Sequence, residues 1–184
     1  QTLYDYEMLT RSHAVPTAQT PTETLEFEKF DFDTTPNGSV QEHRFGTHEA
    51  LIRQVILSHS AQSVCSDGVL HAGGRVFLRF VIMAKRAFDS VVLGTSIKNR
   101  DGLILWGDNT VGMEISLRKG MNVVNMEFSL NIVGGEYLLF CGLADTSYEP
   151  RIELDQRWPA EKISIVSTEK VHEGFVFAPC IISV

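Results

Sequence analysis

The sequence predicts an all-β protein, an immunoglobulin-like antiparallel β-sandwich, and three observations support this prediction. Two apolar runs flank the segment 99–102, which ends in Asp101-Gly102, and Asp-Gly between such runs is a strong β-hairpin signal. Turns that contain glycine recur after residue 45, and no strong amphipathic helix lies between them. Residues 123–130 alternate apolar and polar side chains, as in a strand with one buried face and one solvated face.

The N-terminal part of the chain has a different character from the rest. Residues 1–13 are expected to form one short helix, because Tyr4 and Met8 lie one helical turn apart. Residues 14–44 are rich in Thr, Pro, Gln, Glu and Asp, and a segment of this composition is typical of a linker. We therefore expect a helix and linker over 1–44 and the β-sandwich over 45–184.

Eight strands are expected within the sandwich, separated by turns that contain glycine: 50–58, 75–84, 91–98, 103–108, 121–130, 136–144, 162–167 and 174–183. The strand 75–84 is apolar on both faces, so something besides the core must cover its second face. The last strand is apolar and contains Pro179, which suits an edge position or exchange between subunits. An ordinary terminal strand within one subunit remains the alternative.

Composition and charge exclude several classes of protein. At 184 residues with 43% hydrophobic content, the chain is long enough for one domain with a good core. A formal net charge of -7 argues against a nucleic-acid-binding protein, and no apolar run approaches the roughly 20 residues of a membrane helix. The three cysteines form no C-x-x-C motif, which indicates reduced thiols, although one disulfide with one free thiol stays open.

No motif predicts catalysis or metal binding. The sequence contains neither a phosphate-binding G-x-x-x-x-G-K-[ST] nor a G-x-S-x-G nucleophile motif. The six histidines show no zinc-ligand spacing, and no calcium-binding loop is present. We therefore expect a protein that is not an enzyme, with no catalytic residue, no metal and no cofactor.

Four motifs follow one another along the chain: Arg44-Phe45-Gly46-Thr47-His48-Glu49-Ala50, then Gly73-Gly74-Arg75-Val76, then Val92-Leu93-Gly94-Thr95-Ser96-Ile97 with Asp101-Gly102 and Trp106-Gly107-Asp108-Asn109-Thr110, then Gly134-Gly135-Glu136-Tyr137. Together they resemble the C-terminal domain of Wzt-type proteins, the ATPase subunits of bacterial ABC transporters that export O-antigen polysaccharide. The resemblance covers about three quarters of the chain. Two positions depart from it: Gly74 stands where Glu is more usual, and Trp106 where Phe is common.

The resemblance implies a carbohydrate-binding module that recognises the finished end of an O-antigen, a lipopolysaccharide component, without cleaving it. It also implies a homodimer with a domain swap of the last strand, and a cytoplasmic location at the inner face of the inner membrane. An ATPase domain would precede Gln1 and connect the module to the membrane subunit of the transporter. The alternative is a structural or dimerising β-sandwich with no ligand of its own.

Sugar recognition needs planar side chains that stack on pyranose rings and polar groups that bond to hydroxyls. Four polar residues have expected outward positions: Arg53, Arg79, Asn125 and Glu127. The best candidates for stacking are Tyr137 and Trp158. Arg53, Asn125 and Glu127 are alternatively an ordinary solvated face, and Arg79 alternatively packs its aliphatic stem. Tyr137 is alternatively a corner tyrosine of the sandwich, and Trp158 a plug at its end. Trp106 is assigned to the core or the hairpin.

Overall fold

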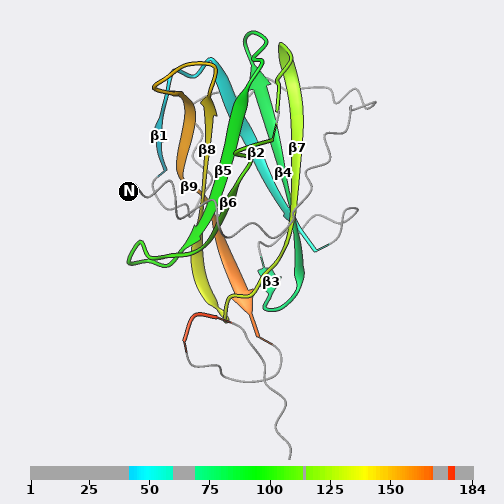
Figure 1. Cartoon of the computed structure of the whole chain (residues 1–184). Helices are drawn as coiled ribbons and strands as arrows, with labels where there is room; N and C mark the ends of the chain where they lie inside the picture. The colour runs from blue at the N-terminus through cyan, green and yellow to red at the C-terminus, as the bar shows by residue number, and fades with distance from the viewer. Residues whose placement is uncertain (1–41, 60–68, 114, 168–173, 177–184) are drawn as a thin grey trace, which may run out of the picture.

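The structure, a computed structural model, describes residues 42–59, 69–113, 115–167 and 174–176 (Figure 1). Within these ranges it contains nine strands and no helix. The strands are β1 (His43–Phe45), β2 (Ala50–Ser58), β3 (Val69–His71), β4 (Arg75–Ala84), β5 (Val91–Lys98), β6 (Ile104–Asn109), β7 (Gly120–Ser129), β8 (Gly135–Asp145) and β9 (Ile152–Val166).

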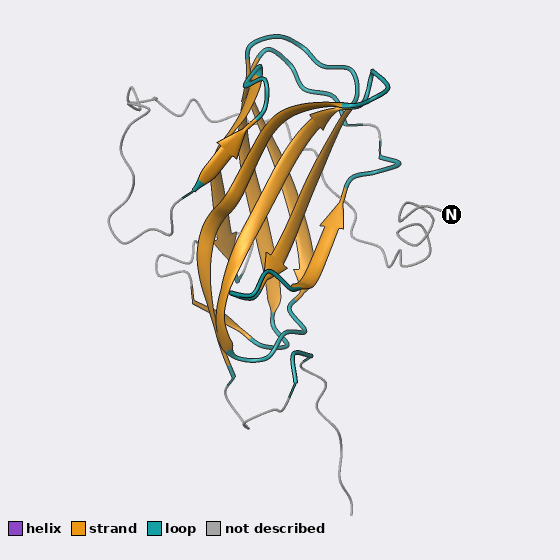
Figure 2. Ribbon diagram, turned by 90° about the vertical axis from the view of Figure 1, so that its left-hand side faces the viewer, coloured by secondary structure: helices purple, strands orange, loops and turns teal. Residues whose placement is uncertain are grey.

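The strands form two sheets that pack face to face (Figures 1 and 2). The larger sheet has the order β1-β9-β8-β5-β6, with β3 added beside β9, and the smaller sheet has the order β2-β4-β7. All pairs are antiparallel except β3 with β9. The prediction of an immunoglobulin-like antiparallel β-sandwich is confirmed.

Both sheets contribute alternate side chains to one hydrophobic core. Phe80 and Ile82 of β4 face Leu93 of β5 and Leu139 of β8, and all four are fully buried. Because successive side chains of a strand point to opposite sides, the residues between these core positions form the outer faces of the sandwich. Those outer faces contain the candidate binding residues except Tyr137, which lies in the core.

The predicted hairpin connects β5 to β6. The amide of Gly102 donates to the carbonyl of Asn99 over 3.1 Å, and Gly102 has φ of 83°, which glycine adopts without strain. The side-chain oxygen of Asn99 accepts bonds from the amides of Asp101 and Leu103. The Asp-Gly signal therefore identified this turn correctly.

Most of the predicted strands match the structure closely, but the prediction for β9 was wrong. The sequence predicted a strand over 162–167, whereas β9 starts at Ile152. Its first half has charged residues, Asp155 and Arg157, on the core side, and this breaks the expected alternation. The short strands β1 and β3 were not predicted, because three residues are too few for a pattern.

Several expected elements lie outside the described residues: the helix over 1–13, the linker over 14–41 and the last strand from residue 177 onward. The expected domain boundary between residues 44 and 45 falls inside β1. Within the described part of that last strand, Val176 forms an isolated antiparallel bridge with Ile132. Of the three cysteines only Cys141 is described, and it is a buried free thiol.

Candidate functional site

The predicted site residues do not form one cluster in the structure. Four of them lie on the smaller sheet, one lies in the core, and Trp158 lies on the larger sheet. Each location has different geometry.

The outer face of the smaller sheet contains the predicted polar residues. Arg79 Nε donates to Asn125 Oδ1 over 3.1 Å, between the neighbouring strands β4 and β7. Further along the same strands, Arg75 forms an ion pair of 2.6 Å with Glu127, diagonally across the register in which Arg75 pairs with Ser129. Arg53 lies at an irregularity in the pairing of β2 with β4. Arg79 with Asn125, and Arg75 with Glu127, are therefore already bonded in pairs, as the side chains of a solvated face are.

Tyr137 lies in the core, with a side chain only 6% exposed. Its hydroxyl donates to the carbonyl of Val133 over 3.0 Å, four residues upstream. Burial also raises the pKa of this hydroxyl. This is the corner-tyrosine geometry of immunoglobulin-like domains, and it leaves no ring face for a sugar to stack on.

Trp158 belongs to an exposed aromatic cluster on the outer face of the larger sheet, which we call the aromatic platform: Phe45, Phe140 and Trp158. The ring centroids of Trp158 and Phe45 are 5.2 Å apart at 82°, and those of Trp158 and Phe140 are 6.3 Å apart at 70°. Phe45 is 44% exposed and Trp158 43% exposed. The three rings come from β1, β8 and β9, which pair side by side.

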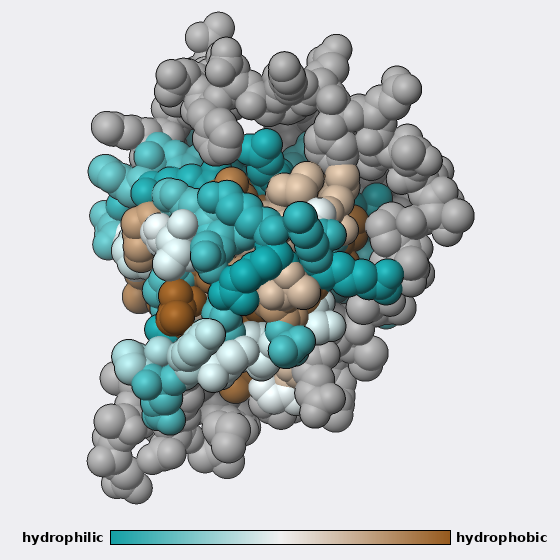
Figure 3. All heavy atoms as spheres, turned by 90° about the horizontal axis from the view of Figure 1, so that it is seen from above, coloured by the Kyte–Doolittle hydropathy of each residue, from teal (hydrophilic) through white to brown (hydrophobic). Residues whose placement is uncertain are grey.

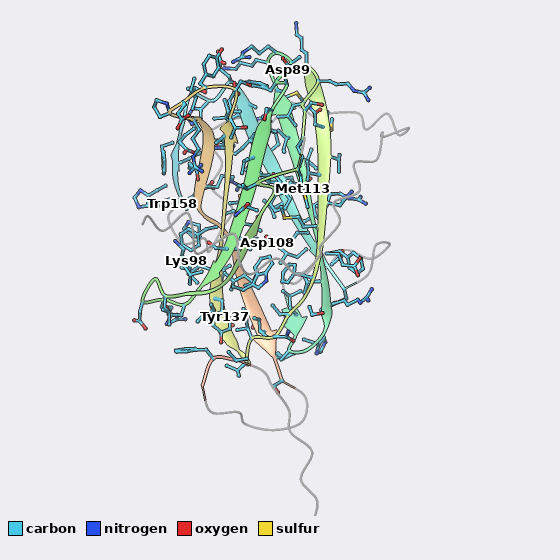
Figure 4. All side chains as sticks on the ribbon, in the orientation of Figure 1. Asp89, Lys98, Asp108, Met113, Tyr137 and Trp158 are labelled. Atoms are coloured by element: carbon cyan, nitrogen blue, oxygen red, sulfur yellow. The ribbon has the colours of Figure 1, made fainter. Side chains whose placement is uncertain are left out.

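A lysine completes the platform. Lys98 is the last residue of β5, and it lies beside Trp158 in Figure 4. Its Nζ is 4.2 Å from the centroid of the Phe140 ring and 5.3 Å from that of Trp158. Both distances are within the range of cation–π attraction. Lys98 takes an outward position in the alternation of β5, and the sequence analysis did not single it out.

Small residues lie next to the platform on the same outer face. Gly94 of β5 pairs with Gly142 of β8, and Ser96 pairs with both Phe140 and Gly107. The side chain of Gln156 lies over Gly142, where an added Cβ would be 2.1 Å from the Gln156 amide oxygen. The platform therefore borders a floor of small residues, part of which the Gln156 side chain covers.

The far end of this face contains an open hollow of about 560 Å³. It is lined by Asp89, Ser90, Val92, Val111, Gly112, Met113, Thr146 and Arg151. Figure 4 shows Asp89 at the upper end of the sandwich, and the surface seen from that end is largely hydrophilic (Figure 3). Val92 pairs with Ala144 two residues before the Gly94–Gly142 pair, so the hollow and the small-residue floor share strands.

Buried ion pairs hold the platform strands in place. Asp155 of β9 is fully buried and accepts two bonds from Arg44 of β1, at 2.7 and 2.6 Å, and one from the amide of Ile52 in β2. Arg157 of β9 bonds to Glu42 at 2.7 Å. Arg44 and Arg157 are the chain neighbours of Phe45 and Trp158, so these pairs fix where both rings project.

Burial shifts the pKa values of three groups close to the platform strands: Cys141, Arg157 and Glu161. It raises the pKa of the Cys141 thiol to about 12 and raises the pKa of Glu161, against the opposing charge of Arg157. Burial also acts to lower the pKa of Arg157, but the bond and charge of Glu42 outweigh it, so that pKa is raised. Cys141 and Arg157 are buried on the inner side of the sheet and are not available to a ligand on the platform, whereas Glu161 is exposed.

The described residues offer no cluster of three or more His, Cys, Asp or Glu side chains that could hold a metal ion. None of their segments is a helix long and apolar enough to cross a membrane. What the platform offers chemically is stacking and hydrogen bonding. Two of its rings, Phe45 and Phe140, were missed by the sequence analysis: Phe45 stands in the first motif but was not assigned to a site, and Phe140 stands in no motif.

Fold and surface together define the class: an immunoglobulin-like β-sandwich that exposes an aromatic platform on the outer face of one sheet. The chain belongs to the Wzt C-terminal domain family, whose model matches residues 41–177. It is similar to a solved structure described as the C-terminal domain of Wzt, with a TM-score of 0.69 and 22% sequence identity. That similarity covers 82% of this chain and 92% of the other.

Two further solved structures are similar over smaller parts. One is a Pseudomonas fluorescens alkylpurine DNA glycosylase, AlkC, at a TM-score of 0.42 and 12% identity, covering 64% of this chain and 30% of the other. The second is a family 123 glycoside hydrolase from Clostridium perfringens, with a TM-score of 0.37 and 10% sequence identity. That similarity covers 54% of this chain and 22% of the other. At these scores neither bears on function. No curated protein sequence matches the chain.

Proposed function

We propose that this chain is a carbohydrate-binding module that recognises the end of an O-antigen polysaccharide for export by an ABC transporter. The observation that carries the proposal is the exposed ring of Trp158, flanked by Phe45 and Phe140 beside a floor of small residues. Aromatic rings of this kind bury the apolar faces of sugars, and neighbouring polar groups bond to the hydroxyls. Membership of the Wzt C-terminal domain family supports this reading.

In the proposed assembly the module binds the polymer and catalyses nothing. An ATPase domain precedes it and joins it to the membrane subunit, at the cytoplasmic side of the inner membrane. Two copies form a homodimer and exchange their last strands. The outer side of β4 supports a partner, because the apolar side chains of Phe77 and Met83 are only half-buried there.

The outer face of the smaller sheet is a second candidate for the sugar site. The exposed bond between Arg79 and Asn125 favours it, since guanidinium and amide groups pair readily with vicinal hydroxyls. It lacks an exposed aromatic ring near that pair among the described residues, apart from the half-buried Phe77. We therefore place the primary site at Trp158.

The test is calorimetric titration of the chain with purified O-antigen polysaccharides of several structures. Trp158→Ala should weaken binding of the cognate polymer about 30-fold, equivalent to about 2 kcal/mol of lost aromatic contact. Arg79→Ala and Asn125→Ala are matched controls on the other sheet, and both should bind like the parent. Melting curves check that each variant is folded.

Two outcomes contradict the proposal. If Arg79→Ala and Asn125→Ala lose binding while Trp158→Ala retains it, the site lies on the smaller sheet. If no polysaccharide binds the parent chain, the structural or dimerising reading replaces carbohydrate recognition.

A further inference from the structure

Lys98 is a cation beside the rings of the aromatic platform, and its ammonium group contacts aromatic rings rather than a carboxylate of the described residues. Its Nζ lies over the rings of Phe140 and Trp158, and no carboxylate of the described residues forms an ion pair with it. The other lysine of this outer face, Lys162, bonds to Glu136 at 2.5 Å. One lysine is therefore neutralised by a carboxylate and the other is not.

Nearby acidic residues point elsewhere. Asp108 pairs with Thr95, whose side chain is buried, so Asp108 projects on the opposite side of the sheet from Lys98. Asp101 lies in the hairpin and accepts a bond from the Asn99 amide nitrogen. Glu136 is taken by Lys162, and the charge of Arg100 in the same hairpin further lowers the pKa of Glu136.

The local charge is thus opposite to that of the whole chain. The chain carries a formal net charge of -7, whereas this end of the outer face has three cations, Lys98, Arg100 and Lys162, against the two carboxylates of Glu136 and Asp101. An ammonium group has three donors and no acceptor. The ring faces attract the charge of Lys98 but leave N–H donors for a ligand stacked on Trp158.

Resting on the proposed function, we infer that the sugar bound at Trp158 carries a negative charge, as a carboxylate or a phosphate, and that Lys98 recognises it. A neutral hydroxyl in that position forms a hydrogen bond with the ammonium but leaves the positive charge without a counter-ion. An anionic group supplies both the acceptor and the charge, and such charge-assisted bonds are about twice as strong as neutral ones.

The experiment compares glucose derivatives that are neutral or carry an anionic group at C6. Methyl β-glucuronide, methyl β-glucoside and glucose 6-phosphate are titrated into the chain, and the indole signal of Trp158 is followed by NMR. Trp106, which is stacked on Phe128 at 3.8 Å, is the internal reference. The charged sugars should bind about tenfold more tightly than the glucoside at low salt, and 0.5 M salt should narrow the difference.

Lys98→Met keeps the apolar stem but removes the charge, so it should reduce binding of the charged sugars to the level of the glucoside. Lys162→Met is the matched control and should leave the ratio unchanged. The glucuronide and phosphate arms distinguish the two kinds of anion.

Three results overturn the inference. The inference is wrong if the glucoside binds as tightly as the charged sugars, or if Lys98→Met still binds the charged sugars more tightly than the glucoside. In both cases the proposed sugar site at Trp158 is not contradicted. If no sugar shifts the Trp158 signal and no polysaccharide binds the chain, both the inference and the proposed function fail.

Discussion

Replacing Asp155 by Ala should destabilise the sandwich by about 3–5 kcal/mol, because this carboxylate joins three strands from both sheets. It is fully buried and accepts bonds from Arg44 Nε, Arg44 Nη2 and the amide of Ile52. The amide of Ile52 lies in the core, where a donor without a partner costs about 1–3 kcal/mol. The Arg44 side chain is 29% exposed, so water replaces part of its contact with the carboxylate. Loss of the ion pair between Arg44 and Asp155 therefore adds about 2 kcal/mol to the cost.

The assay is urea unfolding of the parent, Asp155→Ala, Arg44→Ala and the double variant. Arg44→Ala leaves the buried carboxylate with little compensation, so it should cost about as much as Asp155→Ala. The double variant should then be about as stable as either single variant, which gives a coupling energy of about 3–5 kcal/mol, equal to the cost of one single variant. In thermal unfolding, Asp155→Ala should lower the midpoint by about 10 °C.

The exposed pair of Arg75 and Glu127 is the control. Both side chains are well solvated, so Arg75→Ala should cost less than about 1 kcal/mol. If Asp155→Ala costs no more than Arg75→Ala, or if the Asp155 and Arg44 effects simply add, the reasoning about this buried pair is refuted.

Three further predictions follow from single side chains. Tyr137→Phe should lower stability by about 1 kcal/mol in urea unfolding, through loss of the bond to Val133, and should leave sugar binding unchanged; an unaltered midpoint would contradict this. Because burial raises the pKa of Cys141 to about 12, its thiol stays protonated at pH 8, so mass spectrometry should find it unmodified by iodoacetamide in the native chain and modified in urea. The bond from Lys162 lowers the pKa of Glu136, so the NMR titration midpoint of Glu136 should lie below the usual glutamate value, and the bond is lost as the pH falls through this midpoint. In Lys162→Met the midpoint of Glu136 should rise. Equal midpoints in the parent and the variant would show that Lys162 does not lower this pKa.

The sequence predicts most of this fold because its strands have aliphatic residues on the core side at every second position. In β4 the residues Val76, Leu78, Phe80 and Ile82 are all buried, and the predicted and observed bounds agree. The first half of β9 lacks this pattern, since the inward positions of Asp155 and Arg157 are compatible with a core only when Arg44 and Glu42 pair with them. A local pattern contains no information about such distant partners.

The candidate site was less predictable, for a related reason. Trp158 was chosen from its residue type, but its neighbours Phe45, Phe140 and Lys98 come from three other strands. Only the pairing register of β1, β9, β8 and β5 brings these four residues to one face. For Tyr137 the Gly-Gly-x-Tyr sequence was compatible with an exposed or a buried ring, and the bond to Val133 shows that it is buried.

β1 combines two roles, because Arg44 closes the buried pair with Asp155 while its neighbour Phe45 forms part of the aromatic platform. Detachment of β1 from β9 would therefore dismantle the platform. A ligand that contacts Phe45 binds more tightly when β1 is attached to β9. By thermodynamic linkage, the bound ligand raises the free energy of β1 detachment by the same amount. Slower hydrogen exchange at the amides of β1 would then report occupancy of the platform, even if no strand changes position.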